Sequence, residues 1–267
     1  MRRRMRTRVR RGVYLLPAAL TLGSLFCGFY AIIAVYNDDF TPAAIAILVA
    51  LLLDFLDGAV ARLTHATSDF GVQMDSLADL VAFGVAPGFL AYVYALKPYG
   101  RLGWLAAFSF AACGALRLAR FNITTAKLDK RYFVGLPIPA AAGVIAALVL
   151  FMRESSSFTL LDREWLGLRV AEPAFLGLVY LLAFLMVSRL RYRSLKGVDL
   201  RQPRPATVLF ALLLALLLVA AEPVLLLFGI FLVYALSGLA RTLPFLRRAP
   251  SAEQGEELVL RPGEPAP

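Results

Sequence analysis

The sequence is poor in the residue types that hold metals through nitrogen or sulfur. It contains one histidine and two cysteines among 267 residues. Cys27 and Cys113 lack a paired spacing, so they indicate neither a disulfide framework nor a cysteine-ligated metal site. A single histidine, His65, cannot form the clusters that are typical of zinc centres. Any bound metal would therefore depend on oxygen ligands.

Charged residues are also scarce. Asp, Glu, Lys and Arg make up 17% of the chain, hydrophobic residues make up 60%, and the mean hydropathy is +0.73. These values lie outside the usual range of soluble domains and predict a polytopic membrane protein. Eight apolar runs approach the roughly 20 residues that a membrane-spanning helix needs. The runs are residues 14–36, 42–63, 72–96, 102–121, 136–152, 173–190, 205–221 and 223–240.

Positive charge is distributed unevenly between the loops. If the N-terminus lies in the cytoplasm, the cytoplasmic segments hold 23 of the 28 Lys and Arg residues, and the outer loops hold 5. Lys and Arg are enriched on the cytoplasmic side of membrane proteins. The sequence therefore predicts an all-α transmembrane helical bundle of about eight spans in the cytoplasmic membrane, with both termini cytoplasmic.

The two ends of the chain differ in composition from its apolar middle. Residues 1–12 hold seven arginines, and basic segments beside a first span usually contact anionic lipid, which argues against a nucleic-acid partner. The apolar run that follows lacks an A-x-A cleavage site, so we expect it to stay attached. Residues 13–241 form the predicted transmembrane domain. Residues 242–267, rich in Pro, Glu and Gly, are predicted to be a disordered cytoplasmic tail.

Charged residues interrupt the second apolar run, in the stretch LLLDFLDGAVARL of residues 51–63. A carboxylate near the bilayer centre costs roughly 3 kcal/mol. Asp54 and Asp57 therefore need a compensating partner. On a helix, five residues of this stretch share one face within an arc of roughly 140°. They are Asp54, Asp57, Gly58, Ala61 and Arg62.

A second acidic face follows after a polar break at residues 64–68. Gly71, Asp75 and Asp79 are spaced by four residues, so on a helix they lie within an arc of roughly 80°. Two consecutive helices joined by a short cytoplasmic turn can face each other. Four carboxylates would then meet near the inner membrane surface, where they would repel one another unless cations lay between them.

Carboxylate oxygens suit hard cations such as Mg²⁺ or Mn²⁺. Two such ions among shared carboxylates form the arrangement that holds the attacking and leaving oxygens in phosphoryl transfer. Gly58, Ala61 and Gly71 leave space for a substrate beside the carboxylates, and Arg62 can bind phosphate oxygens. The alternative is that the charges only form structural pairs. Four aspartates against one arginine favour a site instead.

The spacing of these residues follows a known pattern. Residues 54–79 read D-x2-D-G-x2-A-R-x8-G-x3-D-x3-D, which resembles the signature of the CDP-alcohol phosphatidyltransferases at all eight fixed positions. The resemblance implies an enzyme that displaces CMP from a CDP-linked lipid with an alcohol. It implies Asp54, Asp57 and Asp75 as metal ligands. It implies Asp79 as both a ligand and the general base. The residues implied for the CDP-lipid pocket are Gly58, Ala61, Arg62 and Gly71.

Other stretches resemble the phosphatidylserine synthase branch of this family. They are LTLGSLFCGFYAI in the first span, CGALRLARFN, YFVGLPIPAAAG, and SRLRYRS after the sixth span. The resemblance implies CDP-diacylglycerol and L-serine as substrates of an enzyme in the lipid bilayer. Arg117 and Arg120, an i, i+3 pair, could hold the serine carboxylate, and Asn122 could join them. The alternative is that these arginines are ordinary cytoplasmic anchors.

Two other functions remain open at the level of sequence. Another CDP-alcohol transferase would use glycerol 3-phosphate or inositol phosphate as its acceptor. A cation transporter would also carry carboxylates within the membrane. Transporters favour repeated halves with broken helices, and no internal repeat is evident here. The sequence does not distinguish Mg²⁺ from Mn²⁺ or a diacyl from a diether lipid, and it leaves the formation of a homodimer open.

Overall fold

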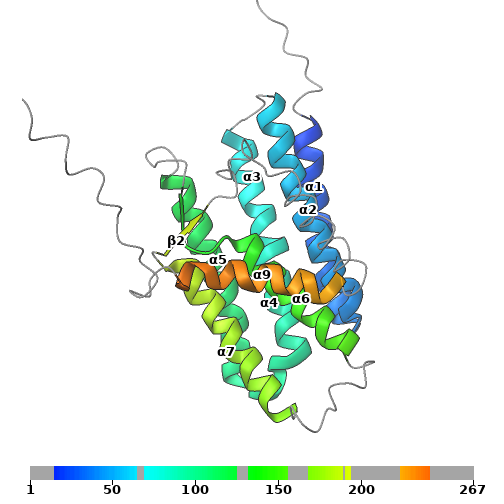
Figure 1. The fold of residues 1–267 in the computed structure, drawn as a ribbon. Coiled ribbons are helices and arrows are strands. Elements are labelled where there is room, and N and C mark those ends of the chain that lie inside the picture. Colours follow the sequence, from blue (N-terminus) through cyan, green and yellow to red (C-terminus); the bar gives the residue numbers. More distant parts are fainter. Residues whose placement is uncertain are drawn as a thin grey trace, which may run out of the picture.

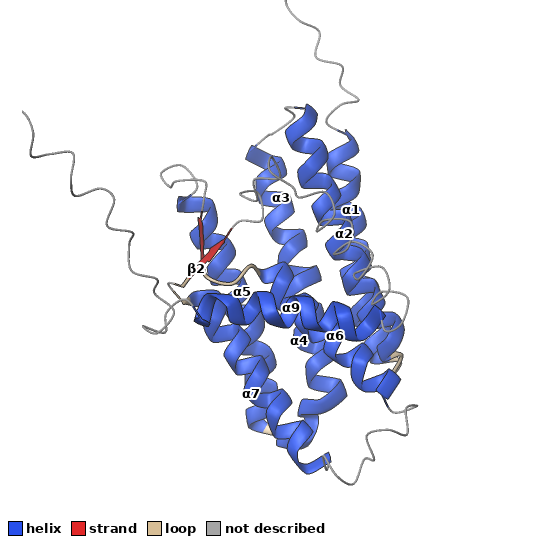
Figure 2. Ribbon diagram, viewed as in Figure 1, coloured by secondary structure: helices blue, strands red, loops and turns tan. Residues whose placement is uncertain are grey.

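The computed structural model describes residues 15–64, 69–124, 132–155, 168–188, 190–193 and 223–240. These residues form a bundle of helices with one short two-stranded ribbon (Figures 1 and 2). Segments labelled η are π-helical or 3₁₀ turns. In chain order the elements are α1 (Leu15–Tyr36), α2 (Phe40–Thr64), α3 (Asp69–Asp79), η2 (Leu80–Val85), α4 (Ala86–Ala91), η3 (Tyr92–Leu96), η4 (Lys97–Tyr99), α5 (Arg101–Thr124), β1 (Tyr132–Val134), α6 (Ile138–Ser155), α7 (Leu168–Val187), β2 (Arg191–Arg193) and α9 (Pro223–Ala240).

Several helices have the length and composition of membrane spans, which confirms the predicted polytopic helical bundle. Two described helices are apolar but shorter, Pro173–Val187 and Pro223–Gly238. The predicted span at 205–221 lies outside the described residues, and so do the predicted terminal segments. The number of spans and the side on which the termini lie stay predictions. The four long apolar helices of the described chain are Pro17–Tyr36, Phe40–Ala61, Phe70–Tyr99 and Arg101–Ile123.

A tight turn joins α1 to α2. Asp38 has a φ angle of 61°, the left-handed conformation that commonly ends a helix. The backbone N–H of Asp39 donates to the carbonyl of Ala34 at 2.9 Å, and that of Asp38 donates to the carbonyl of Val35 at 3.1 Å. This pair of bonds is the Schellman motif, which satisfies carbonyl groups at the end of α1. The short turn makes α1 and α2 an antiparallel pair.

Small residues allow α1 to lie close to its neighbours. A Cβ on Gly28 would overlap the backbone of Ala82 in η2. Close approach of backbones through small residues is the usual way in which helices associate in membranes. Helix α1 is thereby held beside both α2 and η2. The fully buried alanines of α1 and α2 are Ala31, Ala43, Ala44 and Ala50.

The third long helix is not a uniform α-helix. Helix α3 continues directly into the π-helical segment η2, and after α4 a second π-helical segment, η3, follows. π-Helical turns are rare and occur frequently at functional sites. Segment η2 begins at the residue after Asp79. The predicted span at 72–96 lies within this helix, but its apolar sequence gave no indication of the π-helical turns.

A short ribbon ties the start of α6 to the end of α7. Strands β1 and β2 pair antiparallel, with Tyr132 opposite Arg193. The backbone N–H of Gly135 then donates to the carbonyl of Leu190 at 2.8 Å. Gly135 has a φ angle of 84°, and a Cβ there would collide with the carbonyl oxygen of Met186. The ribbon is a local addition to the helical fold that the sequence analysis did not predict.

Candidate active site

Three carboxyl groups meet between α2 and α3. Asp54 and Asp57 lie one turn apart on α2, and Asp75 lies on α3. One carboxylate oxygen of each residue lies within 4.8 Å of those of the other two. The i, i+3 spacing on α2 places two of these groups on one face, and the packing of the bundle brings the third to them. The predicted convergence of the two acidic faces is therefore present for these three residues.

Asp79 lies one turn beyond Asp75 at the end of α3. Its carboxyl group is hydrogen-bonded to that of Asp54. Two carboxylates approach this closely only when a proton or a cation lies between them, because like charges repel strongly away from water. Asp79 thus borders the three-carboxylate cluster through Asp54.

Asp57 is the most enclosed member of the cluster, with 6% of its surface exposed. The Thr21 hydroxyl on α1 lies 2.9 Å from an Asp57 carboxylate oxygen and 3.1 Å from the carbonyl of Pro17. A hydroxyl has one proton, and hydrogen bonds to charged acceptors are the stronger ones. We therefore assign that proton to Asp57. The backbone N–H of Gly58 also donates to this carboxylate.

Thr21 was not among the site residues predicted from the sequence. A signal was nevertheless present, because Thr21 and Ser24 are hydroxyl residues at i, i+3 in the otherwise apolar helix α1. Both are buried. The hydroxyl of Ser24 donates to the carbonyl of Ala50 on α2 at 3.3 Å. Two hydroxyls on one face of an apolar helix indicate a polar partner on the neighbouring helix.

The donor set of this cluster fits a hard divalent cation. All its ligand atoms are carboxylate oxygens, as Mg²⁺ and Mn²⁺ prefer. Asp57 is buried, and Asp54 and Asp75 are half-buried. Three like charges this close are costly without a counter-charge. Asp54, Asp57 and Asp75 could therefore hold a metal ion.

Arg117 on α5 lies close to the acidic cluster. Its guanidinium interacts electrostatically with Asp79 and with Tyr234 of α9. The Nε atom is fully buried and has no hydrogen-bond partner within the described part of the chain. A buried donor without a partner costs about 1–3 kcal/mol. Its position beside Asp79 is suited to an anionic ligand that would use this donor.

The other two residues predicted to bind the acceptor have different surroundings. Arg120, near the end of α5, is exposed. Asn122 is half-buried, and its side-chain amide donates to the hydroxyl of Ser76 on α3 at 3.0 Å. That hydroxyl lies 3.0 Å from the carbonyl of Val72. Asn122 therefore links α5 to the helix that carries Asp75 and Asp79.

The residues predicted to form the CDP-lipid pocket lie on both acidic helices. Gly58 and Ala61 are half-buried on α2, and Gly71 is exposed on α3. Arg62 belongs to α2, but its side chain lies outside the described part of the structure. His65, to which we assign no role, also lies outside it. Gly58 and Ala61 follow the two aspartates of α2, and Gly71 precedes two aspartates of α3.

Residues 14–238 match the CDP-alcohol phosphatidyltransferase profile. The protein belongs to this family of membrane enzymes, which confirms the resemblance seen in residues 54–79.

Individual relatives share one name, CDP-diacylglycerol–serine O-phosphatidyltransferase. The protein of that name from Helicobacter pylori J99 is 42% identical over 186 residues, covering 70% of this chain and 75% of the relative. That from Bacillus subtilis 168 is 44% identical over 126 residues, covering 47% and 70% respectively. That from Saccharomyces cerevisiae S288c is 37% identical over 153 residues, covering 52% and 55%.

Proposed function

We propose that the protein transfers the phosphatidyl group of CDP-diacylglycerol to the hydroxyl of L-serine, forming phosphatidylserine and releasing CMP. The observation that carries this proposal is the name shared by relatives at 37–44% identity. The three-carboxylate cluster of the family motif supports it. Family membership also favours an enzyme over the cation transporter considered from the sequence.

The reaction is a displacement at the lipid-side phosphorus of the diphosphate. The serine hydroxyl oxygen forms a new bond to this phosphorus, and the bond from phosphorus to the oxygen of CMP breaks. The hydroxyl proton must leave, and CMP departs with the electron pair of the broken bond. The protein therefore has to bind both substrates, accept one proton and offset negative charge on the diphosphate.

Asp79 is the proposed proton acceptor. Its carboxyl group is hydrogen-bonded to that of Asp54, and it also interacts electrostatically with Arg117. A hydroxyl placed between the carboxylate cluster and Arg117 would therefore lie within reach of Asp79. General-base catalysis requires such proximity first and a suitable protonation state second.

The carboxylates are the proposed ligands of two divalent cations, Mg²⁺ or Mn²⁺. Asp54, Asp57 and Asp75 would hold them, with Asp79 completing the set. When bound, the cations would neutralise charge on the diphosphate and on the departing CMP. Gly58, Ala61 and Gly71 would leave room for the CDP-lipid beside the carboxylates, and Arg62 would bind its phosphate oxygens.

Arg117 is the proposed anchor for the carboxylate of serine. Its buried Nε would gain a partner, and a guanidinium can bind a carboxylate through two parallel hydrogen bonds. Arg120 and Asn122 remain candidates for the same pocket. The hydrogen bond from Asn122 to Ser76 supports a role in holding α3 instead.

The proposed setting is the cytoplasmic membrane, with the active site facing the cytoplasm. The excess of Lys and Arg in the segments assigned to that side supports this orientation. L-serine and CMP are soluble and would exchange with the cytoplasm, whereas CDP-diacylglycerol and phosphatidylserine would remain in the bilayer.

The test is CMP release by purified protein supplied with CDP-diacylglycerol and one acceptor at a time. The acceptors are L-serine, glycerol 3-phosphate and inositol phosphate, and a reaction without acceptor measures hydrolysis. We expect release with L-serine, its loss in EDTA, and its return with Mg²⁺ or Mn²⁺. Turnover with glycerol 3-phosphate but not serine would disprove the acceptor. Full turnover in EDTA would disprove the metal requirement.

A further inference from the structure

Ile138, the first residue of α6, lies between two glycines of neighbouring helices. A Cβ on Gly84 of η2 would lie 3.5 Å from the δ-methyl carbon of Ile138, and a Cβ on Gly114 of α5 would collide with the same carbon. The Ile138 side chain is fully buried, and both glycines are buried. Gly84 and Gly114 thus form a glycine notch, and the δ-methyl group of Ile138 fills this notch and separates η2 from α5.

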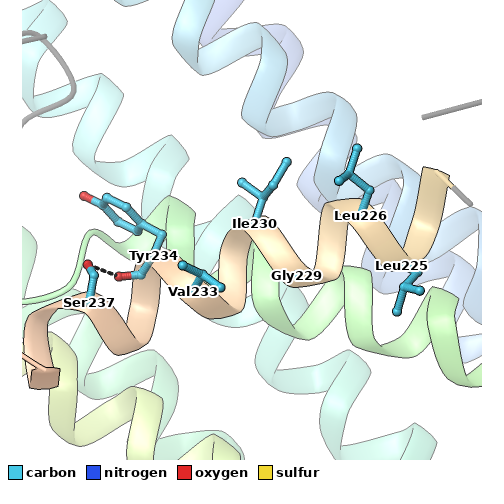
Figure 3. A pocket seen from close by; sticks show the side chains of 7 residues that line it. All are labelled: Leu225, Leu226, Gly229, Ile230, Val233, Tyr234 and Ser237. Atoms are coloured by element: carbon cyan, nitrogen blue, oxygen red, sulfur yellow. Dashed lines mark hydrogen bonds between the residues drawn. The ribbon is translucent and has the colours of Figure 1, made fainter. Parts of the chain in front are cut away.

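Ile138 is held in place from two sides. The backbone N–H of Leu136, two residues earlier, donates to the carbonyl of Leu185 on α7 at 3.0 Å. About 140° round α6 from Ile138, the ring of Phe231 in α9 fills the space beside Gly143. Figure 3 shows the side chains that line an open groove of about 670 Å³ along α9, and helical periodicity places most of them on the side of α9 away from Phe231. Because β-branching also restricts its χ1 angle, Ile138 is a rigid spacer.

Two contacts set how α5 lies against α3 and η2. One is the glycine notch, and the other is the hydrogen bond of 3.0 Å from Asn122 on α5 to Ser76 on α3. The two contacts are eight residues apart on each side, in opposite directions of the chain, so the helices are antiparallel. Asp79 is three residues from Ser76, and Arg117 is three residues from the notch. Asp79 and Arg117 therefore differ in level by about two residues, or about 3 Å along the helix axes.

We propose that Ile138 is a positioning residue that sets the distance between Asp79 and Arg117 and thereby the length of acceptor that fits between them. This inference rests on the proposed transfer to L-serine, in which Asp79 accepts the hydroxyl proton and Arg117 binds the carboxylate. Two carbon atoms separate the hydroxyl oxygen from the carboxylate carbon in serine, and three separate them in homoserine. A rigid spacer favours one of these lengths, and one methylene group typically changes discrimination by about 10-fold to 200-fold.

Gly114→Ala is the variant that should widen the site. The added methyl group takes the position of the Ile138 δ-methyl group, so α5 and η2 have to move apart. We expect KM for L-serine to rise and the kcat/KM ratio of L-homoserine to L-serine to rise about 10-fold, the low end of the effect of one methylene group. KM for CDP-diacylglycerol should stay within about twofold, because acceptor binding alone is changed. An unchanged acceptor ratio in a folded Gly114→Ala enzyme would contradict the proposal.

Ile138→Val removes the δ-methyl group itself. Alone, it adds no bulk and lets η2 and α5 approach, so KM for L-serine should rise several-fold without a gain for L-homoserine. Combined with Gly114→Ala, it moves one methyl group from α6 to α5 and conserves the packed volume, which cores tolerate well. The double variant should therefore recover the wild-type acceptor ratio. Additive effects of the two changes would contradict the proposal.

Gly88→Ala is the matched control. Its Cβ would lie 3.0 Å from the carbonyl oxygen of Ala107, so this variant also adds a methyl group at a tight contact with α5, but on α4, which η2 separates from Asp79. It should lower the melting temperature without changing the acceptor ratio. A similar rise in the homoserine ratio for Gly88→Ala and Gly114→Ala would mean that any loosening of the bundle has this effect, which contradicts a specific role of Ile138.

The outcomes separate this inference from the proposed function. If the wild-type enzyme releases CMP with another alcohol but not with L-serine, the proposed function is wrong. If it uses L-serine and the single variants at Gly114 and Ile138 keep the wild-type KM and acceptor ratio, only the role of Ile138 is wrong. A rise in KM for CDP-diacylglycerol without a change for either acceptor would mean that the notch acts on the lipid, which also contradicts the proposal.

Discussion

Asp57 illustrates how a single carboxylate depends on residues far from it in sequence. Its helix supplies one donor, the N–H of Gly58, and α1 supplies another, the hydroxyl of Thr21. Two donors fix the orientation of the carboxylate. They also occupy two of its lone pairs, so the remaining lone pairs have defined directions. Partners of this kind typically change metal affinity or activity by about 10–100-fold when they are removed. Thr21 therefore prepares Asp57 for the proposed cation.

We expect Thr21→Val to raise the Mg²⁺ or Mn²⁺ concentration needed for half-maximal activity by about 10-fold. Valine keeps the shape of the side chain but cannot donate to Asp57. Thr21→Ser should restore much of the wild-type behaviour. The control is Ser24→Ala, which removes a hydroxyl bonded to a backbone carbonyl on the same two helices. An unchanged metal titration for Thr21→Val would show that Asp57 is oriented without this hydroxyl.

Asp79→Asn tests the proposed base. Asparagine has the size of aspartate but cannot accept the acceptor's proton, so kcat should fall by at least about 10². Binding of CDP-diacylglycerol, measured by thermal shift, should persist. Asp39→Asn, the same change in the exposed turn between α1 and α2, is the control and should be silent. Near-normal turnover by the Asp79 variant would transfer the role of base to another group.

The sequence predicted the acidic residues better than their partners. The spacing of Asp54, Asp57 and Asp75 defines helical faces, and helical periodicity is a local property that can be read directly. Thr21 acts across a helix contact instead, through its hydrogen bond to Asp57 on α2. The two hydroxyls of α1 mark a polar face, but the residue of α2 that each one meets depends on how the two helices pack.

At the scale of elements, α3 and α5 are joined by the hydrogen bond from Asn122 to Ser76. Ser76 follows Asp75 directly and precedes Asp79 by one turn. A link at this point restrains the helix that carries half of the four aspartates. The structure thus suggests a positioning role for Asn122, which the sequence analysis grouped with the acceptor-binding residues.

We predict that Asn122→Ala and Ser76→Ala will have similar effects, because each removes the same hydrogen bond. Each should destabilise the protein by about 1 kcal/mol, and their effects on thermal unfolding and kcat should be non-additive in the double variant. If Asn122 contacts serine instead, its loss will raise KM for serine while Ser76→Ala leaves that KM unchanged.

Gly135 is the most constrained point of the connection between β1 and α6. Alanine there would be strained by the positive φ angle and would collide with the Met186 carbonyl. We expect Gly135→Ala to destabilise the protein by at least about 2 kcal/mol in thermal unfolding. Gly177→Ala on α7 is the control. Its Cβ would meet no atom within 4 Å, and alanine favours a helix by about 1 kcal/mol over glycine.

The ribbon and the π-helical segments are the described elements that could not be predicted from the sequence. Residues 80–96 contain no charged residue, so their hydropathy predicts part of a span but not the register of its hydrogen bonds. The strands of the ribbon have three residues each, which is too short for an alternating pattern to be recognised. Long apolar helices were predictable because the bilayer requires a fixed length.

At the scale of the whole molecule, the distribution of Lys and Arg predicts the topology. We expect Thr7→Cys and Ser251→Cys, each in a chain with Cys27→Ala and Cys113→Ala, to react with a membrane-impermeant maleimide only after the membrane is permeabilised. Asn37→Cys, in the exposed turn between α1 and α2, should react in intact cells. Labelling of either terminal cysteine in intact cells would contradict an even number of spans with cytoplasmic ends.

The positions of these residues along the chain also define an order of assembly during synthesis. Thr21 and all four aspartates lie within the first 79 residues, on α1, α2 and α3. A ribosome delivers these helices to the membrane first, and N-terminal regions generally fold first. Arg117 follows later in the chain, on α5. The proposed cation ligands can therefore come together while translation continues, whereas the proposed anchor of the acceptor has to wait for α5.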